Sequence, residues 1–156
     1  KPPTPGRTSG KADASCPPMF ASWPALAKQV SAPFVMRDVA LWAFTGPFFT
    51  ERPADAAEFA AAMASLDQSV DTYLAQLAVI QNHDATDRLG QIKVPTLYIW
   101  GDADDTVGRA AAEGTGEFID APYQLEVLPG VGHYAADQVP DRVNELLLSH
   151  LHRNAS

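Results

Sequence analysis

Cysteine is almost absent from this chain, in which Cys16 is the one thiol among 156 residues. A single cysteine forms no internal disulfide. Cys16 precedes two prolines in a segment without helix or strand periodicity, so it is a poor candidate for a nucleophile. No cysteine or histidine cluster has zinc spacing, and His150 and His152, two apart on an expected helix and expected to be solvated, do not share a face. We therefore expect no metal and no cofactor.

Basic residues and long apolar runs are scarce as well. Eleven Lys and Arg stand against 19 Asp and Glu, a formal net charge of −8. Binding to nucleic acid requires a basic face that neutralises phosphates, so this class is excluded. No apolar run approaches the roughly 20 residues of a membrane span. The chain begins at Lys1 and shows no signal-peptide pattern, so we expect a portion of a longer protein, with the cytoplasm favoured.

The first 90 residues divide into a linker and a helical segment. Residues 1–20 are rich in Pro, Gly, Ser and Ala, which predicts a loop or linker. Residues 21–90 contain no strand-like run and predict short helices broken by Pro24, Pro33, Pro47 and Pro53. The clearest helix is SVDTYLAQLAVI, whose i, i+3, i+4, i+7 stripe consists of Val70, Tyr73, Leu74, Leu77 and Ile80.

Residues 91–156 predict alternating strands and helices. VPTLYIWGD indicates a buried strand over Val94–Trp100, and YQLEVLPG a second over 123–128. A helix is expected between them over 107–119, and another from Pro140, with a buried stripe of Val143, Leu146, Leu147 and Leu151. This order predicts a parallel sheet with flanking helices. Because two strands leave edges unpaired, the chain is expected to be part of a larger α/β unit.

Two loops that follow the predicted strands carry groups capable of acid–base chemistry. GDADD follows the first strand, and PGVGHY, with His133, follows the second. Working residues of α/β enzymes lie past the carboxyl ends of strands. A carboxylate bonded to one imidazole nitrogen fixes the tautomer and stabilises the imidazolium. Three aspartates compete for this role, with Asp102 also able to cap the loop and Asp105 to begin the next helix. His83 and Asp84 end a helix and open a turn, which favours a structural role.

From about residue 40 to 151 the chain resembles the C-terminal half of an α/β-hydrolase. PTLYIWGDADDTVG is similar to the family pattern P-T-L, apolar residues, G-x-x-D-x-x-V, which aligns Asp104 with the catalytic acid. LPGVGHYAADQVPDRVNELLLSHL resembles the terminal segment, with His133 as the catalytic histidine. LWAFTGPFFTERP and YLAQLAVIQNHDATDRLGQI resemble the cap of the 3-oxoadipate enol-lactonase and carboxylesterase group, and APYQLEVLPGVGH is similar to epoxide-hydrolase-like members.

The resemblance implies an α/β fold: the C-terminal part of an α/β-hydrolase sheet, two parallel strands with flanking helices, preceded by a helical cap. The implied divisions are a loop or linker over 1–20, the cap over 21–90 and the core part over 91–156. Gly130 and Gly132 are expected to permit tight turns before His133, with Val131 anchoring the loop. The aromatic residues either line an acyl pocket or form ordinary cap core: Trp42, Phe44, Phe48 and Phe49.

One departure from the family is decisive for function. The nucleophile elbow, G-x-S-x-G or its aspartate equivalent, is absent, and in GRTSG Ser9 stands one place off the pattern. The resemblance thus implies that the chain supplies the acid, the base and the cap of an esterase- or lactonase-like hydrolase. The nucleophile and the other strands would come from an N-terminal half, and the chain alone would be inactive. The expected substrate is small, apolar and acyl. The alternatives are an epoxide hydrolase or dehalogenase portion with an aspartate nucleophile, and a non-catalytic half that folds with a partner chain.

Overall fold

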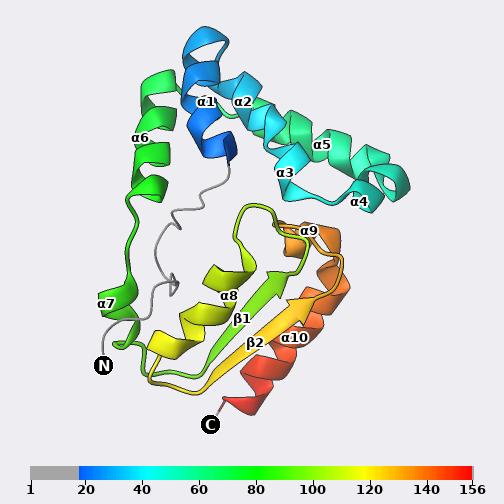
Figure 1. The fold of residues 1–156 in the computed structure, drawn as a ribbon. Helices are drawn as coiled ribbons and strands as arrows, with labels where there is room; N and C mark the ends of the chain where they lie inside the picture. Colours follow the sequence, from blue (N-terminus) through cyan, green and yellow to red (C-terminus); the bar gives the residue numbers. More distant parts are fainter. Residues whose placement is uncertain (1–17, 156) are drawn as a thin grey trace.

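The fold has a helical part followed by a part that contains the strands (Figure 1). The computed structural model describes residues 18–155. The helical part consists of α1 (Pro18–Gln29), α2 (Ala32–Asp38), α3 (Ala40–Ala43), α4 (Gly46–Glu51), α5 (Pro53–Ala64), α6 (Val70–Gln81) and α7 (Thr86–Leu89). The second part consists of β1 (Thr96–Gly101), α8 (Arg109–Thr115), the 3-10 turn η1 (Gly116–Phe118), β2 (Tyr123–Leu128), α9 (Ala135–Gln138) and α10 (Pro140–Arg153).

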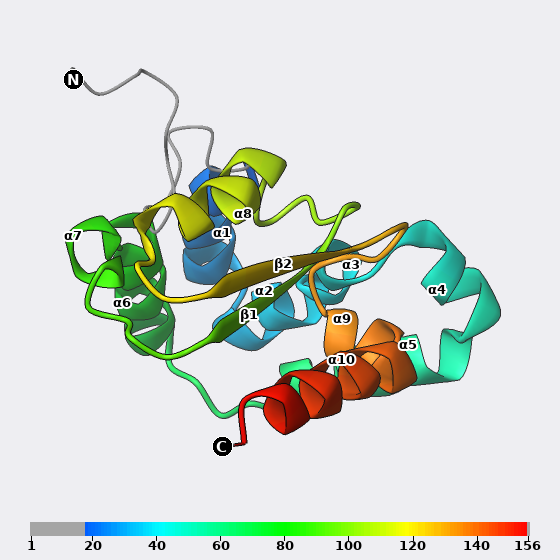
Figure 2. The same ribbon diagram turned by 90° about the horizontal axis from the view of Figure 1, so that it is seen from below.

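The two strands form the parallel pair that the sequence predicts. The register runs from Thr96 opposite Tyr123 to Gly101 opposite Leu128. The first strand begins two residues later than expected, at Thr96. Helix α8 lies on one face of the pair and α10 on the other (Figures 1 and 2). Within the described residues each strand pairs only with the other, so both outer edges of the sheet are open.

Three of the four prolines expected to break the helical segment do begin helices. Pro33, Pro47 and Pro53 lie in the first turns of α2, α4 and α5, where the missing N–H costs nothing. Pro24 contradicts the expectation, since it lies inside α1. A proline there leaves the carbonyl four residues earlier without its helical donor. That carbonyl, Phe20 O, accepts a hydrogen bond from Gln81 Nε2 of α6 at 3.2 Å, which explains how the helix continues.

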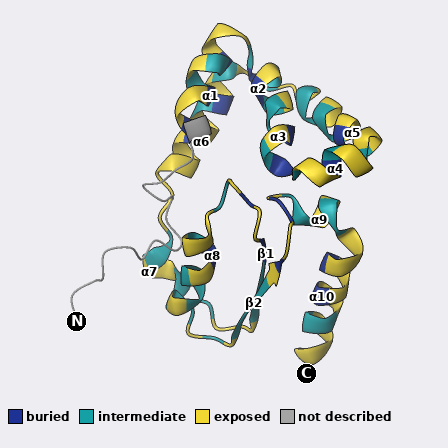
Figure 3. Ribbon diagram, turned by 45° about the vertical axis from the view of Figure 1, so that its right-hand side comes forward, coloured by how far each residue is buried: buried dark blue, intermediate teal, exposed yellow. Residues whose placement is uncertain are grey.

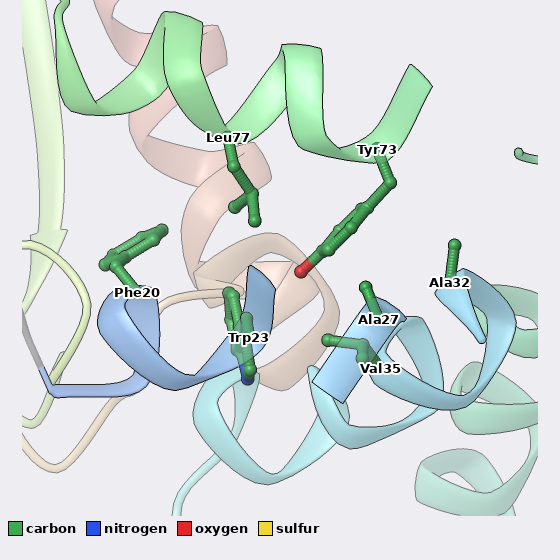
Figure 4. Packing of buried hydrophobic residues seen from close by; sticks show 7 residues of the cluster. All are labelled: Phe20, Trp23, Ala27, Ala32, Val35, Tyr73 and Leu77. Carbon is green, nitrogen blue, oxygen red and sulfur yellow. The ribbon is translucent and has the colours of Figure 1, made fainter. Parts of the chain in front are cut away.

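The helical part has its own hydrophobic core, built by α1, α2 and α6 (Figure 4). The serines before α2 and α6, Ser31 and Ser69, accept backbone N–H groups of the first turns at 3.2 Å and so fix where these helices begin. The predicted stripe of α6 is confirmed at Tyr73 and Leu77 and wrong at Ile80, because the cluster ends at Leu77 among the described residues. The buried members are Phe20, Trp23, Ala27, Ala32, Val35, Tyr73 and Leu77.

A smaller core lies between the sheet and α10. Leu128, Val131, Val143 and Leu146 are buried in it. Pro140 opens α10 as predicted, but the expected stripe is only half right, because Leu147 and Leu151 are 44% and 61% exposed. Each residue turns about 100° around a helix, so Leu147 lies on the flank when Leu146 faces the sheet. Figure 3 shows the buried residues of α10 on the side turned toward the strands.

The boundaries of the predicted linker and of the helix after β1 also differ. Helix α1 begins at Pro18, so the last three residues of the expected linker are helical. Cys16 and Ser9 lie outside the described residues. The expected helix over 107–119 is α8 followed by η1, and it begins only at Arg109.

Candidate active site

The candidate site lies where the two strands end beneath the helical part. The arrowheads of β1 and β2 point toward α3 and α9, and the loops that carry Asp104 and His133 leave the strands at this edge (Figure 1). Because parallel strands bring their carboxyl ends to one edge, the two loops meet there.

Asp104 is the buried carboxylate of this edge, with 9% of its surface exposed. Its Oδ1 accepts the backbone N–H groups of Thr106 at 2.7 Å and Val107 at 2.9 Å. These bonds hold residues 104–107 in a turn, and α8 starts only after Gly108, which occupies its N-cap. The expectation that Asp105 begins the helix is therefore wrong, because the preceding carboxylate binds the amides that would have started it.

His133 lies against the second oxygen of the same carboxylate. Its Nδ1 is 2.9 Å from Asp104 Oδ2, and this is the hydrogen bond that the ring makes within residues 18–155. An ionised carboxylate only accepts, so Nδ1 carries the proton and Nε2 is left as an acceptor. The His133 side chain is 34% exposed against 4% for that of Asp104. The pair thus consists of a buried carboxylate hydrogen-bonded to a more exposed imidazole.

Tyr98 of β1 is a neighbour of this pair that the sequence did not single out. Burial first, and then the negative charge of Asp104, raises the pKa of Tyr98 above its usual value. The phenol therefore stays neutral to a higher pH than an exposed tyrosine does.

Asp102 ties the two loops together, as its proposed capping role predicts. Its Oδ1 accepts the N–H of Gly130 at 2.6 Å. Gly130 has φ 69°, so the expected tight turn is present, and Val131 is buried beneath it. Gly132 has no positive φ, so the tight turn expected there is absent, although a side chain at this position would be obstructed as expected. A Cβ there would lie 2.8 Å from the carbonyl oxygen of Ala43, so glycine allows the helical part to approach the loop.

The four aromatic candidates for an acyl pocket separate in space. Phe44 and Phe48 are buried and stacked, with centroids 4.2 Å apart, and Phe49 packs on them. Trp42 packs instead against the core of α1, α2 and α6. Phe59 and Tyr134, which the sequence did not suggest, complete the aromatic cluster beside His133, since the Tyr134 ring is 5.0 Å from Phe59 and 5.5 Å from the imidazole.

An open cavity of about 440 Å³ lies beside His133. None of the four predicted aromatic residues lines it, so their positions favour the core interpretation, and substrate binding by them stays a prediction. The lining is mainly apolar and comes from β1, the His133 loop, α9 and α10. It consists of Ile99, His133, Tyr134, Ala135, Ala136, Asp137 and Val143.

Asp84 and His150 make hydrogen bonds to the backbone away from the candidate site. Asp84 Oδ1 accepts the N–H of Thr86, the first residue of α7, at 3.1 Å, in keeping with the turn role predicted for it. His150 was expected to be solvated, but its Nε2 lies 3.2 Å from the carbonyl oxygen of Pro95, because α10 packs along β1. No group of three or more potential metal ligands occurs among residues 18–155. In the same range no helix has the length and apolar character needed to cross a membrane.

Comparison with solved structures identifies the fold. An α/β hydrolase enzyme from a Medee basin deep-sea metagenome library superposes with a TM-score of 0.75 at 19% identity, covering 94% of this chain and 54% of that one. The enol-lactonase from Burkholderia xenovorans superposes with a TM-score of 0.74 at 17% identity, covering 85% and 50%. A thermophilic esterase from Thermogutta terrifontis superposes with a TM-score of 0.70 at 20% identity, covering 96% of this chain and 55% of that one. The chain has the fold of the C-terminal half of an α/β-hydrolase.

The expected α/β-hydrolase fold is thereby confirmed, with a helical part followed by two parallel strands and their flanking helices. The chain spans about half the length of these α/β-hydrolase structures. Epoxide hydrolase 3 from Xenopus tropicalis is 29% identical over 69 residues, which cover 40% of this chain and 19% of that protein. No protein-family profile matches the chain.

Proposed function

We propose that this chain supplies the cap, the base and the acid of a hydrolase that acts on ester, lactone or similar acyl bonds. His133 is the base, Asp104 is the acid, and the nucleophile comes from polypeptide outside this sequence. The observation that carries the proposal is the 2.9 Å contact between His133 Nδ1 and the buried carboxylate of Asp104, at the strand ends of an α/β-hydrolase fold.

The geometry supports a defined proton path. A nucleophile hydroxyl attacks the acyl carbon and gives its proton to His133 Nε2, and the resulting imidazolium is stabilised by Asp104. The imidazolium then protonates the departing alkoxide, which leaves an acyl-enzyme. Water repeats the sequence on the acyl-enzyme and releases the acid. The two hydrogen bonds that Asp104 Oδ1 accepts from backbone N–H groups keep the carboxylate from rotating away from the ring.

The cavity supports a small apolar acyl substrate. Ile99, Ala135, Ala136 and Val143 give it largely hydrocarbon walls next to the imidazole. Apolar lining with a few polar groups is the usual character of small-molecule sites. The names of the enol-lactonase and of the esterase among the structural neighbours agree with an acyl substrate.

The open sheet and the surface of α10 support an N-terminal half as partner. Both outer edges of the β1–β2 pair lack a neighbour within the described residues. Leu147, Leu148 and Leu151 expose 44%, 56% and 61% of their surface along α10. Unpaired edges and contiguous apolar surface promote association. Light scattering of the chain alone is expected to show self-association, and a soluble monomer that unfolds cooperatively would contradict the need for a partner.

The proposed activity is tested with this chain joined to, or mixed with, a polypeptide that carries the N-terminal strands and the nucleophile elbow. Hydrolysis of short-chain p-nitrophenyl esters and of a γ-lactone is measured for the wild type and for His133→Ala. We expect the variant to lose about a thousandfold or more in kcat. A folded His133→Ala variant with wild-type kcat would refute the role of His133, and a folded assembly inert on every substrate would favour a non-catalytic half.

A second candidate is an epoxide hydrolase or dehalogenase portion, favoured by the match to Epoxide hydrolase 3. There an aspartate of the other half would attack carbon, and His133 would activate water to cleave the ester formed on it. A single turnover in H₂¹⁸O separates the two candidates. An aspartate nucleophile gains ¹⁸O in its carboxylate, whereas a serine gains none and ¹⁸O appears in the product acid.

A further inference from the structure

The helical part is fastened directly to the segment that follows His133. The N–H of Tyr134 donates to the carbonyl oxygen of Ala43 at 3.0 Å. The guanidinium of Arg52 donates from the end of α4 to the carbonyl oxygens of Asp137 at 3.0 Å and Gln138 at 3.3 Å. The strand ends and the cap thus meet along a hydrogen-bonded seam that begins one residue after the imidazole.

The side chain of Gln138 occupies the centre of this seam. Its Oε1 accepts the N–H of Gly132 at 3.0 Å. Its Nε2 donates to the carbonyl oxygen of Gly130 at 3.2 Å and to Thr45 Oγ1 at 2.8 Å. The side-chain amide of Gln138 therefore binds the backbone on both sides of Val131, immediately before His133. It also binds a hydroxyl of the cap.

The chemistry of these partners selects a primary amide. Gly132 offers a donor and Gly130 an acceptor, so the side chain must accept and donate at once. A glutamate could accept from Gly132 and from the Thr45 hydroxyl, but it would face the Gly130 carbonyl with a second acceptor. A methionine has a similar length and could make none of the three bonds. Gly132 has no room for a Cβ beside Ala43, so the cap backbone lies against the loop at the same place.

We propose that Gln138 is a positioning residue that couples the cap to the catalytic histidine. Its amide keeps the 130–132 loop in the conformation that directs the His133 ring to Asp104, and Thr45 makes that conformation depend on the docked cap. This inference builds on the proposed hydrolase function. The orientation of the base, and hence kcat, then depends on the cap, whereas Gln138 itself does not line the cavity and contributes little to substrate affinity.

The test uses the assembled hydrolase with four variants and a control. Gln138→Met removes the whole amide, and Gln138→Glu retains two of the three bonds. Thr45→Val removes only the hydrogen bond between Gln138 and the cap, whereas Thr45→Ser keeps a hydroxyl that can accept it. Gln76→Met is the matched control, because Gln76 is an exposed glutamine of α6 whose amide oxygen accepts a hydrogen bond from the half-buried Gln68. Esterase kcat and KM are measured well below each variant's Tm, together with amide hydrogen exchange at Gly132 in the folded protein.

The expected pattern separates positioning from simple stabilisation. Gln138→Met should lower kcat about tenfold to a hundredfold with KM within about twofold, since small misplacements of a catalytic group have such effects. Thr45→Val should lower kcat about threefold to tenfold, the effect of one neutral hydrogen bond. Gln138→Glu should fall between these two, and Thr45→Ser and Gln76→Met should match the wild type. Exchange at Gly132 should accelerate about tenfold or more in Gln138→Met.

The inference is overturned if Gln138→Met keeps wild-type kcat, or if it lowers only Tm. It is also overturned if Thr45→Val keeps the wild-type kcat while Gln138→Met lowers it, because the cap would then have no part in the coupling. Should Gln138→Met not fold, Gln138→Glu and Thr45→Val still decide between these outcomes. Failure of the proposed function looks different, since His133→Ala would then be as active as the wild type while the exchange change at Gly132 would persist.

Discussion

Replacing Asp104 by asparagine should disable the base while leaving the fold intact. In the wild type, one carboxylate oxygen accepts two backbone amides and the other accepts His133 Nδ1–H. An asparagine can keep its carbonyl on Thr106 and Val107 and turn its NH₂ toward the ring. Nδ1 must then accept, so the proton moves to Nε2 and the base is lost.

The opposite orientation of the asparagine is excluded by its cost. Turning the NH₂ toward Thr106 and Val107 would leave two part-buried backbone donors facing a donor. At the lower end of the about 1–3 kcal/mol that an unsatisfied buried donor costs, the flipped state lies about 2 kcal/mol higher. The wrong tautomer therefore dominates, and kcat should fall about 10⁴-fold, as loss of the correct tautomer does in serine hydrolases.

Steady-state ester hydrolysis by the assembled enzyme measures this effect, and a thermal melt checks the fold. Asp102→Asn and Asp105→Asn are the matched controls from the same loop. An asparagine at 102 keeps an acceptor for the Gly130 N–H, and Asp105 is exposed, so both should stay within about tenfold of the wild type. An Asp104→Asn variant that folds and keeps its kcat within tenfold would show that the carboxylate does not orient the base.

Three further outcomes concern Tyr73 and Gln81 of α6 and Tyr123 of β2. Tyr73→Phe should keep or raise the free energy of unfolding, by up to about 1 kcal/mol, because the buried hydroxyl has no hydrogen-bond partner among the described residues; denaturant titration measures it. Burial raises the pKa of Tyr73 and of Tyr123 to about 12. The folded phenols thus keep protons that the unfolded chain releases above about pH 10, so stability should fall as pH rises from about 10 to 12, and absorbance at 295 nm should show the late ionisation. Gln81→Met should destabilise the chain by about 1 kcal/mol, and less in a Pro24→Ala background, where residue 24 regains an N–H for Phe20 O; equal costs in both backgrounds would refute this role of Gln81.

The sequence predicted the strands and the site loops well because their signals are local. A short apolar run between Pro95 and Gly101 favours a strand, and the second run is similar, although most residues of both strands are half-buried rather than buried. Asp104 stood among three aspartates, and only the family spacing separated them. In the structure, the hydrogen bond to His133 belongs to Asp104, whereas its catalytic role and the domain limits at 20 and 90 stay predictions.

What the sequence could not predict depends on contacts between distant segments. Pro24 was expected to break a helix, and the compensating amide lies in α6, far along the chain. Gly132 was explained by backbone conformation, although it is the approach of Ala43 that requires glycine. Leu147 and Leu151 were placed in a buried stripe, but the packing of α10 on the sheet leaves them 44% and 61% exposed. Gln138 carried no local signal, because its three partners become neighbours only in the folded chain.

The most direct measurement of the central claim is complementation. This chain and a separate N-terminal half with the nucleophile elbow are assayed for ester hydrolysis alone, together, and together with His133→Ala in this chain. We expect activity only in the mixture and its loss by about a thousandfold or more with His133→Ala. Hydrolysis by this chain alone, or a mixture whose activity survives His133→Ala, would contradict the proposed role of His133 and the need for a second half.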